Sequence, residues 1–361
     1  MPSVSRPGLS GWGGLAAFWL AVLLILGIGG GVLQALGPPP PRTAPAKVAS
    51  ARPVVPPPSA AAPKPAVVVE HRPEPPPANR PGRDTPGPTA DPDPALLEPT
   101  PGSPSDLLPR VAADGRMPMQ VYAAGFDRTS RRPRVGLLIA GIGLNEADSD
   151  RAVRDLPSAV TFAISAYANR VQRLLAAARL AEHEYLLSIP MEPVGFPMND
   201  PGQRALMTNL RVEDNMARLD WVLSRVAGYV GVTNALGAMR GERLSGQTEQ
   251  MDPLLATIAR RGLLYVDARP PGSGGAPALP HVWSRDVDLV VDEPTGQIDQ
   301  NLAELEHIAR DKGSALGLAG APQPVTVQRI AAWANGLMDR GIALAPVSAL
   351  AVPPAEGGVA K

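Results

Sequence analysis

Few residues in this sequence could carry metal or nucleophilic chemistry. The chain has 361 residues, no cysteine and four histidines, namely His71, His183, His281 and His307. The lack of cysteine excludes disulfides, thiolate metal sites and a cysteine nucleophile. A metal site or a catalytic triad that needs histidine must therefore use one of these four. His183 lies at the end of an expected helix, where a cation would be favourable, and we interpret it as structural.

A loop with the shape of an active-site loop follows an apolar run, Val135–Ala140. The run stops at Gly141-Ile142-Gly143, and a helical pattern begins near Glu146. A buried strand delivers a functional loop in this way in α/β proteins, yet this loop contains no acid, base or nucleophile. The two glycines also begin a dinucleotide fingerprint, but Glu146 at the third position would repel a pyrophosphate. We therefore favour an ordinary turn and expect no cofactor.

The overall composition limits the partners and divides the chain. The sequence has 34 basic and 34 acidic residues, so its net charge is zero and argues against nucleic-acid binding through bulk charge. Many of the 44 prolines lie between Gly37 and about Pro104, in stretches such as PVVPPPSAAAPKPA. This composition lacks the apolar periodicity of a folded core, and it predicts a disordered proline-rich linker over residues 38–131.

An uncharged segment precedes this linker. Residues 11–37, after a short tail of residues 1–10, contain no charged side chain and are long enough to span a bilayer of about 30 Å. Trp12 and Trp19 suit a membrane interface. A cleaved signal peptide is the alternative, but its apolar region is normally only about 7–15 residues long. We expect an uncleaved single-span membrane anchor.

The charges beside this segment and the proline-rich tract point to opposite membrane sides. Arg6 and the amino terminus are the positive charges before the segment, whereas Arg42, Lys47 and Arg52 follow it. The count of positive charges favours a cytoplasmic domain. A long proline-rich tether, in contrast, suits a spacer that holds a domain away from the membrane.

Residues 132–353 read as one domain, followed by a tail of residues 354–361. Strand-like and helix-like patterns alternate, which predicts parallel strands joined by helical crossovers. About seven such units predict a (β/α) barrel with its function on the loops after the strands. Strands are expected at 135–140, 160–164, 185–189, 230–233, 263–266, 289–292, 315–319 and 342–345. Helices are expected at 146–155, 170–182, 212–226, 247–261, 295–312 and 326–340.

The loops after these strands resemble, in their order, those of the divergent polysaccharide deacetylase family. They read AGIG, SIPMEPVGFP, TNALGA, DARPPG and AGAPQP. The segments PMEP, VTFAI and VDAR and the terminal LAPVSAL carry the resemblance, which covers about residues 134–350. It implies a distorted (β/α) barrel and a role in the metabolism of envelope polysaccharides.

The resemblance also implies a divalent metal held by one aspartate and two histidines. Such a metal lowers the pKa of its bound water from about 15.7 to near 7 and polarises an N-acetyl carbonyl. This sequence departs from the family at each ligand. Ala140 and Gly141 stand at the aspartate pair, and Ala235 and Ala321 at the two histidines. Ser188 stands at the histidine of the family's HLPMEP motif, so we expect no catalytic metal.

Four polar residues match family positions and are expected at the mouth of the barrel: Glu192, Asn234, Asp267 and Arg269. They predict either a residual sugar pocket or loop architecture, in which Asp267 pairs with Arg269 and Asn234 bonds to loop backbone. Asp267 and Glu192 could also form an acid–base pair, but without a metal nothing activates the water.

Three classes of function stay open. The first is a membrane-anchored pseudoenzyme that binds a glycan or an envelope protein. The second is an active deacetylase with a relocated site, and the third is a structural envelope tether. We interpret Arg240 and Arg243 as parts of a solvated loop rather than an anion site. Because the resemblance implies work on envelope polymers, we expect the barrel in the periplasm, against the count of positive charges.

Overall fold

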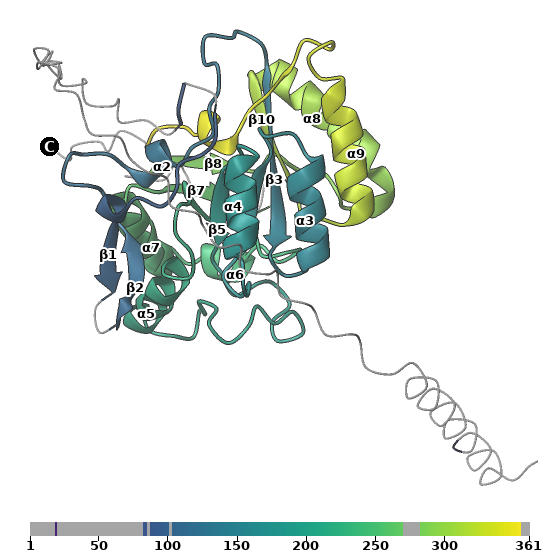
Figure 1. Cartoon of the computed structure of the whole chain (residues 1–361). Helices are drawn as coiled ribbons and strands as arrows, with labels where there is room; N and C mark the ends of the chain where they lie inside the picture. Colours follow the sequence, from purple (N-terminus) through teal and green to yellow (C-terminus); the bar gives the residue numbers. More distant parts are fainter. Residues whose placement is uncertain (1–18, 20–81, 85–86, 101–102, 270–281, 355–361) are drawn as a thin grey trace, which may run out of the picture. The chain divides into compact units, whose positions relative to one another are not determined.

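The computed structural model describes residues 19, 82–84, 87–100, 103–269 and 282–354 (Figure 1). The chain divides into two compact units, 1–71 and 72–361, and the second holds all described residues except Trp19. The expected anchor, 11–37, therefore lies outside the described residues apart from Trp19. Residues 1–10, 38–81 and 355–361 lie outside them as well. Within the described ranges, no helix is long and apolar enough to cross a membrane.

A parallel sheet forms the centre of the second unit. Its strands lie in the spatial order β8-β7-β6-β5-β4-β3-β10-β9, and β11 also pairs with β3. They are β3 (Arg134–Ile142), β4 (Thr161–Ser165), β5 (Tyr185–Ser188), β6 (Gly231–Thr233), β7 (Leu264–Asp267), β8 (Ser284–Asp286), β9 (Leu289–Val290), β10 (Ser314–Ala319) and β11 (Ala343–Leu344). All eight expected strands are confirmed within a few residues, and β8 is an additional strand.

One extended segment links the two edges of this sheet. β8 pairs with β7 and β9 pairs with β10, and only Val287 and Asp288 separate β8 from β9. The Val287 N–H donates to Asp267 O on one side, and the Asp288 N–H donates to Leu316 O on the other. If β8 and β9 are counted as one strand, the path from β8 to β9 has seven strands, with β11 beside it. This arrangement fits the expected (β/α) barrel of about seven parallel strands.

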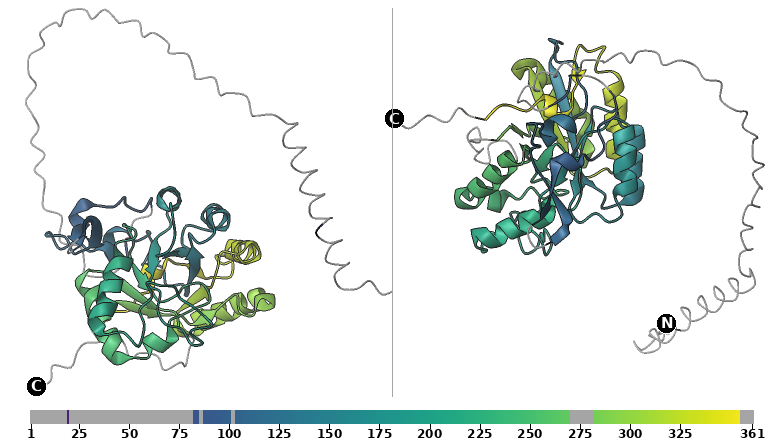
Figure 2. Two further views of the ribbon diagram at one scale, coloured as in Figure 1. Left: turned by 90° about the horizontal axis from the view of Figure 1, so that it is seen from below. Right: turned by 60° about the vertical axis from the view of Figure 1, so that its left-hand side comes forward.

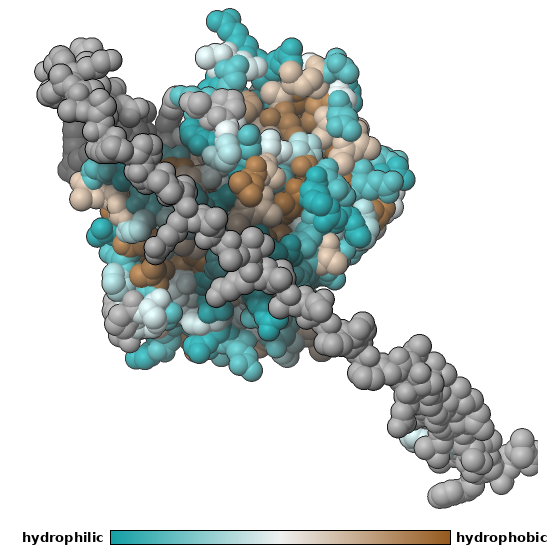
Figure 3. Space-filling view, viewed as in Figure 1, coloured by the Kyte–Doolittle hydropathy of each residue, from teal (hydrophilic) through white to brown (hydrophobic). Residues whose placement is uncertain are grey.

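Helices follow the strands and lie around the outside of the sheet, as the left view of Figure 2 shows. They are α3 (Glu146–Asp155), α4 (Gln172–Leu180), α5 (Val212–Leu223), α7 (Thr248–Arg260), α8 (Ile298–Lys312) and α9 (Pro324–Asn335). All six were expected, whereas the short helix α6 (Glu242–Ser245) was missed. On the face shown in Figure 3, hydrophobic residues lie in small groups among hydrophilic ones, as on ordinary protein surfaces.

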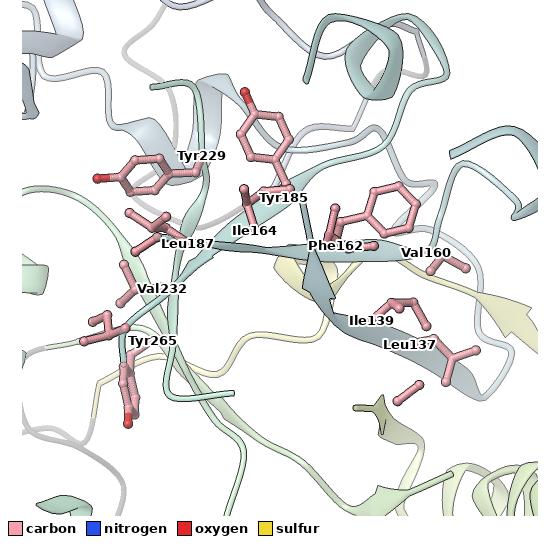
Figure 4. Packing of buried hydrophobic residues seen from close by; sticks show 14 of the residues in the cluster. Leu137, Ile139, Val160, Phe162, Ile164, Tyr185, Leu187, Tyr229, Val232 and Tyr265 are labelled. Atoms are coloured by element: carbon pink, nitrogen blue, oxygen red, sulfur yellow. The ribbon is translucent and has the colours of Figure 1, made fainter. Parts of the chain in front are cut away.

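Alternate residues of the strands form two separate parts of the core. Leu137, Phe162 and Leu187 belong to the part that packs against the helices (Figure 4). Leu138 and Ala163 belong to a second part, together with other residues of the strands and of the terminal segments. Side chains of successive strand residues point to opposite faces, so a sheet covered on both faces needs this continuous apolar sequence.

The prediction of a disordered linker is wrong for the described residues between 82 and 131. This range contains the turn η1 (Pro94–Leu96), the antiparallel strands β1 (Leu97–Thr100) and β2 (Ser103–Pro109), and the short helix α2 (Pro118–Val121). Strand β2 contacts α5, and Figure 1 shows the hairpin beside it. Leu96 and Leu108 are fully buried. The proline content of the whole tract concealed these few apolar residues, each of which has a place in the core.

A buried carboxylate ties this N-terminal segment to the strands and to the C-terminal segment. Glu184 is fully buried, and its Oε1 accepts from Thr161 Oγ1 (3.0 Å) and from the Ser348 N–H (2.9 Å). Its Oε2 accepts from the Ala124 N–H (3.1 Å) and from Ser348 Oγ (2.6 Å). Burial raises the pKa of Glu184, and these hydrogen bonds oppose the rise. The four donors come from segments that are far apart in the sequence.

His183 is not the helix-terminal cation that its sequence position suggested. It is fully buried, and its ring lies 4.4 Å from the ring of Phe162. Its Nδ1 lies 2.9 Å from Val160 O, which can only accept, so Nδ1 carries the proton. Burial lowers the pKa of His183 and favours the neutral ring. The interpretation of His183 as structural agrees with these contacts, but a charged ring does not.

We predict that a chain beginning at residue 132 is much less stable than one beginning at residue 82. The shorter chain loses Leu96, Leu108 and the Ala124 donor to Glu184. Each large apolar side chain contributes about 1.5–3 kcal/mol by burial. The thermal midpoint should fall by roughly 10 °C or more, as circular dichroism would measure. Equal midpoints for the two chains would mean that the hairpin is dispensable.

We also predict that His183 makes the fold less stable at mildly acidic pH. Because its folded pKa is lowered, only the unfolded chain takes up the proton as pH falls below about 6.5. The stability is therefore present above pH 6.5 and is lost on acidification, by about 1.4 kcal/mol for each pH unit. Urea unfolding at pH 7.5 and pH 5.5 measures this loss. His183→Asn should remove it and His307→Asn, on an exposed face of α8, should not; an unchanged loss in His183→Asn would contradict the assignment.

Candidate functional site

The positions that correspond to the family's metal ligands lie at the carboxyl ends of the strands. Ala140 and Gly141 are in the last residues of β3, Ala235 follows β6, and Ala321 follows β10. In Figure 1 the arrow of β3 points toward the side on which α6 lies, so these loops gather there. This is the side on which parallel α/β folds carry their sites.

Three of these loops meet through their backbones. Gly141 has a φ of +72°, and a Cβ on it would lie 3.3 Å from the carbonyl oxygen of Gly320. A Cβ on Gly320 would in turn lie 3.3 Å from the carbonyl oxygen of Gly237. The loops after β3, β6 and β10 are therefore in close contact, and side chains at these glycines would push them apart.

The residues present do not fit the metal that the family pattern implies. Ala140, Ala235 and Ala321 have methyl side chains, which cannot coordinate a cation, and Ser188 at the end of β5 is fully buried. Across the part of the chain that the structure describes, no three His, Asp or Glu side chains could together hold a metal ion. Zinc sites normally take three or four such ligands or cysteines.

Asp267, Arg269 and Asn234 form one hydrogen-bonded cluster, and all three are buried. Arg269 Nη2 donates to Asp267 Oδ2 (2.6 Å), and Arg269 Nε also donates to this carboxylate (3.0 Å). Asn234 donates to Asp267 Oδ1 and to Ser245 Oγ, each at 3.2 Å, and its Oδ1 accepts from the Ala268 N–H (2.7 Å). Asp267 also raises the pKa of Arg269 through these hydrogen bonds. The cluster joins the loops after β6 and β7 to α6, so its donors and acceptors are used internally.

Glu192 lies in a second network. Its Oε2 accepts from the N–H and the hydroxyl of Thr208, both at 2.7 Å, and its Oε1 pairs with Arg243 (3.1 Å). Its carbonyl oxygen accepts from the Leu244 N–H in α6 (3.2 Å). Glu192 thus fixes the long loop after β5 to α6. No hydrogen bond between Glu192 and Asp267 is found among the described residues.

The glycine loop after β3 folds back on its own helix. The Gly143 N–H donates to Ser149 Oγ (2.9 Å), and Asn145 Oδ1 caps α3 by accepting from the Asp148 N–H (3.0 Å). A phosphate bound at this loop would need free N–H groups, but the Gly143 N–H is already bonded within the loop. The geometry agrees with an ordinary turn.

An open cleft of about 460 Å³ lies beside these contacts. Its lining residues belong to the loops after β3, β4, β5 and β6: Leu144, Tyr167, Asn199, Asp200, Pro201, Gly202, Leu236, Gly237, Ala238 and Met239. None of the four predicted site residues is among them. The TNALGA loop reaches residues 236–238, but no motif pointed to Tyr167 or Asp200.

Close packing holds Tyr167 in this cleft. Gly202 has a φ of +95°, and a Cβ on it would lie 2.7 Å from the Tyr167 hydroxyl oxygen. The hydroxyl accepts from the Arg204 N–H (3.3 Å), and the Asp200 carboxylate accepts from the Gly202 N–H (2.8 Å). Burial raises the pKa of Tyr167. The cleft therefore combines a fixed aromatic ring with carboxylate and amide groups.

Two further polar contacts at this end were not expected. Asp292, after β9, accepts from the Gly320 N–H (2.9 Å), and burial raises the pKa of Asp292. Arg240 is buried and pairs with Glu293 (2.7 Å). The interpretation of Arg240 as part of a solvated loop is wrong, because its side chain is buried. Arg243, in contrast, is about half exposed.

The chain is similar to one known protein family and to several solved structures. The sequence profile described as divergent polysaccharide deacetylase matches residues 137–351. The crystal structure of an uncharacterized protein from Agrobacterium tumefaciens C58 is 34% identical, with a TM-score of 0.62, over 68% of this chain and 99% of that chain. No curated protein matches the chain.

More distant structures share less of the fold. The family 4 carbohydrate esterase from Streptomyces lividans in complex with acetate is 15% identical, with a TM-score of 0.37, over 62% of this chain and 98% of that chain. This likeness is too weak to carry an argument about activity. The family profile covers more than half of the chain, and on that ground this chain belongs to the divergent polysaccharide deacetylase family.

Proposed function

We propose that this chain binds a glycan of the bacterial envelope and does not hydrolyse its acetyl groups. One observation carries the proposal: at the family's ligand positions the loops offer methyl groups and meet through backbone at Gly141, Gly237 and Gly320. The fold of a polysaccharide-acting family is retained, while the groups that would activate water are missing.

The remaining acids cannot replace a metal. A water without a Lewis acid keeps a pKa of about 15.7, so hydroxide is scarce at neutral pH. The carboxylates of Asp267 and Glu192 are each occupied by an arginine and by other donors. Their contacts stabilise loops, and both side chains are buried and lie outside the lining of the cleft.

The cleft beside the glycine contacts is the proposed binding site. It has apolar walls at Leu144, Leu236 and Met239 and polar groups at Tyr167 and Asp200. Ligand sites commonly combine mostly apolar walls with a few oriented polar groups. A sugar presents both apolar ring faces and hydroxyl groups, so this lining is suited to it.

The proposed setting is the periplasmic face of the bacterial inner membrane. The uncharged segment 11–37 supports an anchor, and the proline-rich sequence after it supports a spacer. A barrel from a family of polysaccharide-acting proteins would meet its polymer there. An envelope protein is the other partner that this position would allow.

We predict that the full-length protein binds N-acetylated oligosaccharides without releasing acetate. Isothermal titration calorimetry would measure the binding, and an enzymatic acetate assay would measure the release. Ala238→Arg places a large side chain in the exposed part of the cleft and should weaken binding by about ten-fold or more, equivalent to about 1.4 kcal/mol. Leu180→Ala, at an exposed apolar residue on α4, is the control and should have no effect.

Two outcomes would contradict this prediction in different ways. Acetate release that Asp200→Asn abolishes would support an active deacetylase with a relocated site. Absence of binding to every tested glycan would support a structural tether instead.

We also predict that the full-length protein fractionates with membranes and that a reporter fused after Lys361 is active in the periplasm. Alkaline phosphatase, which requires the oxidising periplasm to form its disulfides, is a suitable reporter. A fluorescent protein that folds only in the cytoplasm is the matched control. Fluorescence together with inactive phosphatase would place the domain in the cytoplasm, as the count of positive charges predicts.

A further inference from the structure

Three arginines gather around Trp221 of α5, beside the cleft. The guanidinium carbon of Arg204 lies 5.5 Å from the centre of the Trp221 ring, and that of Arg225 lies 5.1 Å from it. Arg218, one turn before Trp221 on α5, donates through Nη1 to the Ala205 carbonyl. The indole holds two of the three cations by cation–π attraction.

These three arginines differ from the others on this side of the molecule in their ion pairing. Arg211 pairs with Asp214 (2.9 Å), and Arg261 lies 3.7 Å from Asp220. For Arg204, Arg218 and Arg225, in contrast, no ion pair is found with any residue that the structure describes. Two of the three acids of α5, Asp214 and Asp220, are thus engaged by other arginines.

The arginine group, defined as Arg204, Arg218 and Arg225, adjoins the proposed glycan cleft through Tyr167. Tyr167 lines that cleft, and its ring lies 6.0 Å from the ring of Trp221. A second hollow, of about 340 Å³, is lined by Arg204, Leu210, Asp214, Ala217 and Arg218. Arg204 therefore belongs to the hollow and, through its N–H bond to the Tyr167 hydroxyl, adjoins the cleft.

The charges of this group act on the residues around it. Burial is the main cause of the raised pKa of Tyr167, the Asp200 carboxylate adds to the rise, and Arg218 and Arg204 oppose it. Asp200 is bonded to the Gly202 N–H in the cleft. Asp214 lines the hollow, but it is already paired with Arg211. The three cations thus exceed the two carboxylates of the cleft and the hollow, Asp200 and Asp214, although the whole chain is neutral.

Cations held close together with too few counter-ions repel one another, and a bound anion relieves this repulsion. A guanidinium also matches the geometry of a carboxylate or a phosphate, to which it can donate two parallel hydrogen bonds. We propose that Arg204, Arg218 and Arg225 bind the acidic groups of an anionic glycan whose chain continues into the cleft lined by Tyr167. This inference rests on the proposed glycan-binding function and specifies the class of glycan.

The test compares acidic and neutral oligosaccharides of equal length on the full-length protein. The acidic probes are an oligogalacturonate and a phosphorylated oligomannoside, and the neutral probe is a chito-oligosaccharide. We expect one of the acidic probes to bind at least about ten-fold more tightly than the neutral probe. Because Arg204 and Arg225 are exposed, this preference should shrink as salt rises from 50 mM to roughly 500 mM.

Variants then locate the preference. The double variant Arg204→Gln/Arg225→Gln should lose roughly ten- to hundred-fold in affinity for the preferred acidic probe and keep its affinity for the neutral probe. Arg225→Lys, which keeps the charge but not the paired donors, should lose less. Arg329→Gln is the control, since Arg329 pairs with Asp299 at an exposed site on α9. Circular dichroism would verify that each variant is folded.

The outcomes separate the two proposals. Equal binding of acidic and neutral probes, or full acidic affinity in the double variant, would overturn the arginine proposal and leave the glycan cleft standing. If none of the probes bound, both would be overturned. Binding of a single-stranded DNA oligonucleotide as tight as that of the acidic glycan would also overturn it, because the group would then recognise any polyanion.

Discussion

The close approach of three glycine loops is the constraint on which the proposed function of this molecule depends. A Cβ at Gly141 or at Gly320 would lie 3.3 Å from a carbonyl oxygen of the next loop. Backbone thus lies against backbone where a barrel of this family would bring its metal ligands together. Alanines at the neighbouring positions 140, 235 and 321 keep the loops compact, and none of them can coordinate a cation.

The polar residues around this contact are engaged with one another. The Asp267–Arg269–Asn234 cluster and the Glu192–Thr208–Arg243 network both attach loops to α6, and Asp292 holds the Gly320 N–H. Buried charges that are paired in this way keep a precise loop arrangement. The space that remains open lies to one side, at Tyr167 and Asp200, and it adjoins the arginine group around Trp221. Binding without hydrolysis is the function that we propose for this arrangement.

Much of the fold could be predicted from the sequence, because strands and helices with strong apolar periodicity form where the pattern places them. Strand β8 and helix α6 were missed because they are short and depend on tertiary contacts. The hairpin of β1 and β2 was missed because its segment is rich in proline, although Leu96 and Leu108 are buried in the core. At the site, the alanines and the glycine that stand at the family's ligand positions could be read directly from the motif loops. The cleft could not, since Tyr167 and Gly202 stand at loop positions outside the motifs and meet only in the folded chain.

Titration of zinc into the full-length protein, purified without chelator, tests the central claim most directly. If the backbone contacts and the alanines exclude a metal, calorimetry should show no stoichiometric binding, and elemental analysis should find less than about 0.1 zinc per chain, since a site needs three or four ligands. One equivalent of tightly bound zinc, lost in a variant of Asp200, Asp267 or Asp292, would contradict the account and show that ligands from other loops form a metal site.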